Sequence, residues 1–294
     1  MARSLLAKRR RGEGAHWSAI LPNRWALLLT VPLLVVLLGF VVYPLVKLAI
    51  DSLTTGSGIG NYEAVFQSPA GRRALVTTVV ASLLVGAVAV TLGGLLAWHI
   101  RISRHRAVRV LLWLAVLAPF WMGTVVKNYA IVILLSGEGP LDKLLELVGL
   151  SPVSWLYTST AVAIGMVYTM VPYAAFSLYG VFVSIDESLL EAARGLGASR
   201  ARAIRTVLLP LAMPGIVASA ALVFAISLGF YVSPVLLGGA QTPFMASYIQ
   251  DYIFTFFNYP IASAASVILL AVALLTLGLA LALVGRTRLQ RAVA

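Results

Sequence analysis

The chain of 294 residues contains no cysteine and few charged residues. The absence of cysteine excludes disulfides, zinc–thiolate sites and cysteine nucleophiles. Charged residues make up only 11% of the chain, whereas hydrophobic residues make up 61% and the mean hydropathy is +0.97. An ordinary globular domain is about 25% charged, so a soluble fold could not cover this much apolar surface. The composition therefore predicts an all-α polytopic membrane protein and excludes a cytosolic enzyme, a disordered chain and a disulfide scaffold.

Groups that could carry out catalysis are also scarce. The three histidines, His16, His99 and His105, are not paired with a carboxylate or with one another at metal-ligand spacing. The chain lacks a Gly-x-x-x-x-Gly-Lys phosphate loop, and the glycine-rich stretch at 56–60 is expected to be a flexible loop that opens no helix. An intramembrane protease or a proton-coupled carrier would need buried acids or histidines. We therefore expect no enzyme activity and no metal or cofactor bound by this chain.

Six apolar stretches are long enough to cross a bilayer, which requires about 20 helical residues. They cover residues 25–50, 74–100, 108–135, 160–183, 214–237 and 261–284. A basic segment precedes the first stretch, which is too long for a signal-peptide core and is expected to remain in the mature protein.

The basic residues identify the cytoplasmic side. With the N-terminus inside, 17 of the 22 Lys and Arg residues fall on one side of the membrane. They lie in an N-terminal tail (1–24), two loops (101–109 and 194–205) and a C-terminal tail (286–294). The positive-inside rule then places both tails in the cytoplasm, with a membrane domain over 25–285. Topology and anionic lipid explain the net charge of +12, so no nucleic-acid partner is expected.

Two outer segments and one lysine allow alternative interpretations. Residues 139–149 have the pattern of a short amphipathic helix, with Asp142 on its polar face. The aromatic residues between 248 and 259 suit a headgroup-level belt, or alternatively a vestibule for a cation with Asp251 as the counter-charge. Lys127 either snorkels outward, or follows an early end of the third span, or faces a water-filled path.

The inner loop at about 184–210 predicts a helix–glycine–helix hairpin. Ser184 and Glu187 have the spacing of a capping box, Gly195 and Gly197 can end the first helix, and Ser199 can cap the second. One face of this hairpin is apolar and the other charged. These properties fit equally well with lipid contact or with docking of a partner.

This hairpin resembles the EAA motif in the membrane subunits of ATP-binding-cassette (ABC) importers. The matching residues are Glu191, Ala192, Ala193, Gly197, Leu209 and Pro210, and Val207 stands where the family usually has isoleucine. The resemblance implies a type I ABC importer permease fold, with the 184–210 hairpin contacting a cytoplasmic ATPase. It also implies a second permease subunit forming a heterodimer, two ATPase subunits that carry ATP and Mg²⁺, and an extracytoplasmic substrate-binding protein.

Three further stretches, 167–173, 229–239 and 249–251, resemble the spermidine/putrescine permease group. The resemblance implies a polyamine as the solute, in the inner membrane of a bacterium. Candidate residues for the solute pathway are Lys127, Asn128, Tyr129, Tyr168, Tyr173, Tyr231 and Asp251. Permeases for ferric iron, phosphonates, opines or amino-acid-like solutes are alternatives, as is a carrier or channel that needs no ATPase.

Overall fold

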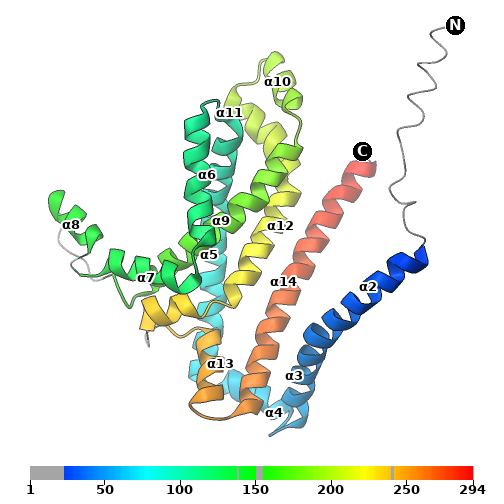
Figure 1. Ribbon diagram of the computed structural model, residues 1–294, viewed down its shortest axis with the longest axis vertical. Coiled ribbons are helices and arrows are strands. Elements are labelled where there is room, and N and C mark those ends of the chain that lie inside the picture. Colours follow the sequence, from blue (N-terminus) through cyan, green and yellow to red (C-terminus); the bar gives the residue numbers. More distant parts are fainter. Residues whose placement is uncertain (1–22, 138, 150–154, 240–241, 294) are drawn as a thin grey trace. The chain divides into compact units, whose positions relative to one another are not determined.

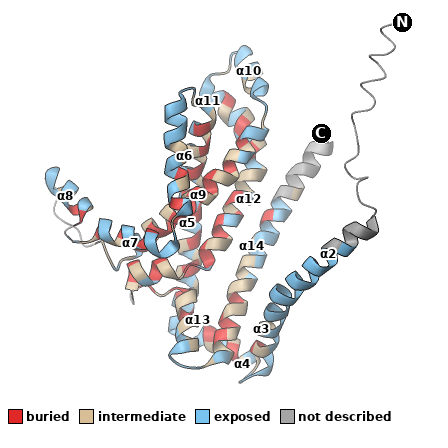
Figure 2. Cartoon of the chain, in the orientation of Figure 1, coloured by how far each residue is buried: buried red, intermediate tan, exposed pale blue. Residues whose placement is uncertain are grey.

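The computed structural model describes residues 23–137, 139–149, 155–239 and 242–293, which form helices and connecting turns without any strand. The chain divides into two units, 1–51 and 52–294. The first contains α2 (Asn23–Leu37), the π-helical turn η2 (Leu38–Val42) and most of α3 (Tyr43–Thr54). Every side chain from Val31 to Lys47 is exposed, although most are apolar (Figure 2). Such a surface is stable only against lipid or another protein.

The second unit is a bundle of long helices with short helices at both ends (Figure 1). Its elements are α4 (Ile59–Gln67), α5 (Pro69–Ile102), α6 (Arg106–Trp121), α7 (Thr124–Leu135), α8 (Pro140–Leu147), α9 (Ser159–Ser184), α10 (Glu187–Gly195), α11 (Arg200–Ala203), η3 (Ile204–Leu208), α12 (Leu209–Leu228), η4 (Pro234–Gly238), α13 (Met245–Phe254) and α14 (Tyr259–Val293). The α5–α6 turn and the α10–α11 hairpin lie at one end of this unit, and α4 and α13 lie at the opposite end. The basic loops 101–109 and 194–205 therefore share one end.

The described helices include five long enough to cross a membrane, and a bent pair would make a sixth. The bent pair corrects the predicted third span. Residues 108–135 are not one helix, because Met122 and Gly123 are extended and the segment from Thr124 turns by 111° from α6. Hydropathy could not reveal this bend, since both arms are apolar and hydropathy carries no information on backbone direction.

The predicted fifth span at 214–237 is also wrong at both ends. The helical run begins at Arg200 and ends at Leu228, and η4 is a separate turn. The π-helical turn η3 ends two residues before Pro210, just as η2 ends two residues before Pro44 in the first unit. A proline ring clashes with the carbonyl four residues before it, and a wider turn relieves that clash without ending the helix. The second arm of the hairpin thus continues directly into a membrane span.

Small residues hold α5 against α9. The side of α5 facing α9 carries Ala89, Gly93 and Ala97, all fully buried or nearly so. A Cβ on Gly93 would lie 2.7 Å from both the Cβ of Ala174 and the backbone nitrogen of Ala175. Membrane helices pack closely in this way, because small side chains let the backbones approach.

The glycine-rich segment at 56–60 opens a helix, contrary to the prediction that it would not. Gly58 precedes the first residue of α4, and the buried Asn61 side chain donates to the carbonyls of Ser52 (3.1 Å) and Thr55 (2.8 Å). Gly56 and Gly58 have φ of 66° and 61°, which glycine adopts without strain. The glycines therefore shape a turn that leads into a helix.

Candidate functional site

The 184–210 hairpin begins at a cap different from the predicted one. Asp186 is the N-cap of α10, and its carboxylate accepts from the backbone amide of Ser188 at 2.9 Å. Ser184 instead donates to the carbonyl of Val181, so the Ser184–Glu187 capping box is wrong. The amide of Ser188 lowers the pKa of the Asp186 carboxyl. The contribution of this cap to stability is therefore present above the usual aspartate pKa and is lost as the pH falls through the lowered pKa.

Glycine ends the first arm of the hairpin as predicted. Gly197 has φ of +88°, its amide donates to the carbonyl of Arg194 at 3.0 Å, and the Ala198 amide donates to that of Ala193 at 3.1 Å. This pair of bonds is a Schellman motif. Nothing lies within 4 Å of a Cβ on Gly197, so its backbone conformation alone requires glycine. Ser199 caps α11 as predicted, accepting from the amide of Arg202.

The hairpin presents an exposed surface of mixed character. None of the α10 side chains is fully buried, and Leu196 is 91% exposed. Glu191 and Ala192 are exposed, while Ala193 is half-buried. Leu209 and Pro210 are exposed where the second arm enters α12. Figure 2 shows α10 largely in the colour of exposed residues beyond the end of the long helices, and a surface that exposes both apolar and charged residues can contact a partner.

Lys127 and Asn128, two of the pathway candidates, are buried in α7. Lys127 is 3% exposed and so does not snorkel outward, and the helix break before α7 agrees with an early end of the third span. The Asn128 amide donates to the carbonyl of Thr124 at 2.8 Å. Its Oδ1 lacks a hydrogen-bond partner among the described residues and packs towards Gly165 of α9.

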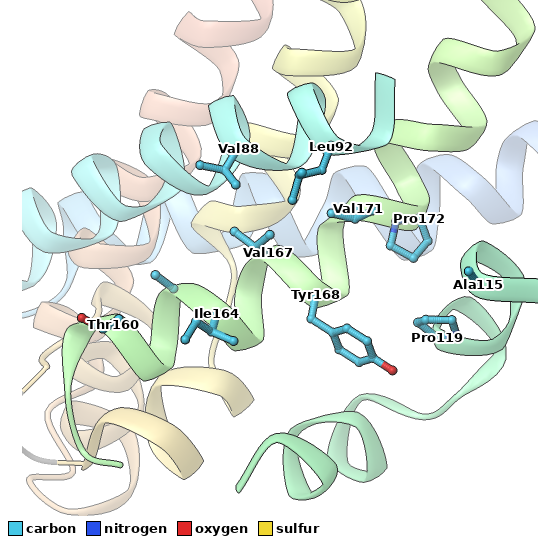
Figure 3. A pocket seen from close by; sticks show the side chains of 11 residues that line it. Val88, Leu92, Ala115, Pro119, Thr160, Ile164, Val167, Tyr168, Val171 and Pro172 are labelled. Carbon is cyan, nitrogen blue, oxygen red and sulfur yellow. The ribbon is translucent and has the colours of Figure 1, made fainter. Parts of the chain in front are cut away.

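Tyr168 is the pathway candidate that lines a cavity. This apolar cavity, about 510 Å³ in volume, lies between α5, α6 and α9. Figure 3 shows the Tyr168 ring beside Pro119, with Val88 and Leu92 on the opposite wall. The other six candidates do not line this cavity.

The remaining candidates are dispersed. Tyr129 is exposed, and the Tyr173 ring packs against Phe120 with centroids 5.3 Å apart. The Tyr231 hydroxyl donates to Gln250 Oε1 at 2.8 Å, joining the η4 region to α13, and Asp251 is exposed on α13. Asp142, expected on the polar face of α8, is 2% exposed instead. This single chain therefore does not gather the seven candidates into one site.

Arg101 is a residue whose contacts the sequence did not reveal. It was counted only as an inner-loop charge, yet its guanidinium donates to two backbone carbonyls at the end of α9, those of Phe182 and Ile185. An arginine in the last turn of α5 was visible in the sequence, but its partners are more than 80 residues away.

Comparisons with known proteins agree with this architecture. Residues 89–289 match the profile of the family "Binding-protein-dependent transport system inner membrane component". The chain is similar to the spermidine/putrescine transport system permease protein PotB of Escherichia coli (strain K12), with 36% identity over 181 residues. The matched segment covers 60% of this chain and 65% of that relative, which is less than two thirds of its length. PotB of Haemophilus influenzae is also 36% identical, over 55% of this chain and 58% of that protein.

Two solved structures share the fold. A chain of a bacterial alginate ABC transporter, in complex with an alginate pentasaccharide-bound periplasmic protein, has a TM-score of 0.78 at 22% identity, covering 90% of this chain and 95% of that chain. A chain of the MetNI methionine ABC transporter has a TM-score of 0.58 at 18% identity, covering 73% and 94%. These likenesses confirm the predicted all-α fold, which this chain shares with chains of ABC transporters.

Proposed function

Because the chain belongs to the family of inner membrane components of binding-protein-dependent transport systems, we propose that it forms half of an ATP-driven solute pathway. Members of this family are transport components, so the chain is a multi-pass inner membrane transporter subunit and not an enzyme. The observation that carries the proposal is the 184–210 hairpin, which is capped at both arms and runs unbroken into the span Arg200–Leu228.

The hairpin docks on a cytoplasmic ATPase. That partner binds ATP and Mg²⁺, whereas this chain binds neither. Two features support docking of the hairpin on an ATPase rather than contact of the hairpin with the lipid surface. Leu196 is almost fully exposed and Glu191 is exposed on the same hairpin, so the hairpin offers a partner both apolar and charged side chains. No loop separates the second arm of the hairpin from α12. Displacement of the hairpin by a partner therefore displaces the membrane span that contains α12.

A second, related permease and an extracytoplasmic binding protein complete the complex, together with two ATPase subunits. The alginate transporter was solved in complex with a pentasaccharide-bound periplasmic protein, which supports a partner of this kind. The apolar side chains exposed along α2 and η2 suit contact with lipid or with the second permease.

A polyamine is the proposed solute, and the similarity to two PotB proteins supports it. The test is uptake by the full complex in proteoliposomes, with spermidine and putrescine as probes. We expect saturable uptake that requires both ATP and the binding protein. Uptake of ferric iron, a phosphonate, an opine or an amino acid instead of polyamine would support the importer function but contradict polyamine as the solute. Uptake that does not require ATP would contradict the importer function.

Both termini are proposed to be cytoplasmic, with the 101–109 and 194–205 loops on the same side. A reporter that is active only in the cytoplasm should be active when fused to the C-terminus. A second reporter, active only outside the cytoplasm, should be active when fused after Gly149 at the end of α8. Exchanging the two reporters serves as the control, and an extracytoplasmic signal from the C-terminus would contradict the orientation.

A further inference from the structure

The end of α5 is attached to the junction between α9 and the 184–210 hairpin by one arginine. Arg101, in the last turn of α5, donates from Nη1 to the carbonyl of Phe182 and from Nη2 to that of Ile185 at 2.7 Å. The last carbonyls of a helix have no amide partner within the helix, and a cation suits the negative end of its dipole. Arg101 thus donates to two carbonyls at the point where α9 ends, of which that of Phe182 also accepts from the amide of Ile185 at 3.3 Å.

Two aromatic rings, those of Trp98 and Phe182, lie at this contact. The Trp98 ring meets the Phe182 ring edge to face at 6.0 Å, and the Arg101 guanidinium carbon lies 5.8 Å from the centre of the Trp98 ring. Phe182 is 6% exposed and packs in a cluster with Leu208 of η3 and Ala212 of α12. The arginine therefore lies where α5, α9 and the second arm of the hairpin meet.

The connection between α9 and α10 is short and lies beside this contact. Only Ile185 and Asp186, both with extended backbones, separate Ser184 of α9 from Glu187 of α10. A movement of α10 could be absorbed by rotation at these two residues. The planar guanidinium of Arg101 donates to the carbonyls of Phe182 and Ile185 at once, and rotation at Ile185 would break one of these two bonds.

We propose that Arg101 is a positioning residue for transport: it clamps the start of the hairpin to α5, so that displacement of α10 by the ATPase moves α5. The proposal rests on the coupling role proposed above for the 184–210 hairpin. Arg104 makes a matched control, because it carries the same charge, is exposed and belongs to the same inner loop.

The direct test measures whether α5 and α10 move together. Because the chain has no cysteine, spin labels can be placed at Ile102→Cys and Ser188→Cys in the assembled transporter, with and without ATP and Mg²⁺. With Arg101 present, we expect one narrow distance distribution that nucleotide does not change. Arg101→Gln should broaden it or make it respond to ATP, Arg101→Lys should be intermediate, and Arg104→Gln should match the parent.

A functional test accompanies it, with spermidine as the probe. Arg101→Gln should retain binding-protein-stimulated ATP hydrolysis within about twofold and transport roughly tenfold less spermidine per ATP hydrolysed. Arg104→Gln should leave this ratio unchanged. If Arg101→Gln does not accumulate, Arg101→Lys replaces it in both experiments.

The outcomes separate this proposal from the coupling role itself. The clamp is overturned if the glutamine or lysine variant has the parent distance distribution, or if nucleotide already changes the distance in the parent. If Gly197→Asp abolishes stimulated hydrolysis but Arg101 variants leave the distances unchanged, the hairpin couples without the clamp. If Gly197→Asp has no effect, the coupling role fails, and the clamp is then overturned as a transport element.

Discussion

Replacing Gly197 with aspartate should abolish coupled transport while leaving the protein inserted in the membrane. Gly197 has φ of +88°, where a side chain costs about 1–2 kcal/mol, and its amide closes the turn at the end of α10. An aspartate adds a side chain and a negative charge to this turn, on a hairpin that already exposes Glu191. We expect binding-protein-stimulated hydrolysis and uptake to fall more than tenfold, measured on the purified complex together with retention of the ATPase.

Gly195 provides the matched control for Gly197→Asp. It lies two residues away on the same hairpin, has no positive φ, and would have open space around an added Cβ. Gly195→Asp should be milder if the turn is what matters, and Gly197→Asn should recover part of the activity, because asparagine tolerates a positive φ. If Gly197→Asp keeps its ATPase and full transport, the hairpin is not the coupling element and rests on lipid instead.

Enlarging Gly93 should prevent the α5–α9 pair from packing. An alanine Cβ would lie 2.7 Å from the Cβ of Ala174 and from the nitrogen of Ala175, so the helices must separate. Overpacking of this kind costs about 1–3 kcal/mol, which corresponds to a fall of roughly 5 °C in the midpoint of thermal unfolding in detergent. Gly93→Leu should accumulate poorly or not at all.

Gly86 tests whether the destabilisation expected for Gly93→Ala is due to the position of Gly93 at the helix crossing or to the replacement of any glycine in α5. It lies on the same helix and is also buried, yet nothing lies within 4 Å of a Cβ placed there. Gly86→Ala should therefore leave the unfolding temperature unchanged or raise it, since alanine is the better helix former. Equal destabilisation by both alanine variants would contradict the close approach at Gly93.

The local chemistry of the hairpin was largely predictable, because it depends on neighbours in the sequence. Gly197 as the turn residue and Ser199 as the second cap are confirmed. The first cap was assigned to Ser184 instead of Asp186, since both lie just before the helix and spacing alone favoured the capping box. Similarly, Pro140 and Gly149 frame α8 as expected, but the burial of Asp142 depends on residues far away in the sequence.

The candidate solute pathway was much less predictable. Lys127 and Asn128 were selected as polar residues in an apolar stretch, yet their burial in α7 depends on the bend at Met122 and Gly123. Tyr168 lines a cavity only because α5 and α6 form its other walls. The spacing of residues along one sequence contains no information on which helices pack against one another.

Composition, hydropathy and the distribution of arginine by themselves determined that this is an α-helical membrane protein, because a bilayer imposes long apolar helices and a bias in loop charge. Short-range spacing likewise determined the form of the 184–210 hairpin, since caps and turns involve neighbouring residues. Only the tertiary structure decided that the third apolar stretch bends, that Gly93 lies at a helix crossing and that Arg101 holds the end of α9. These features arise from contacts between residues distant in sequence, and one-dimensional patterns do not encode the geometry of such contacts.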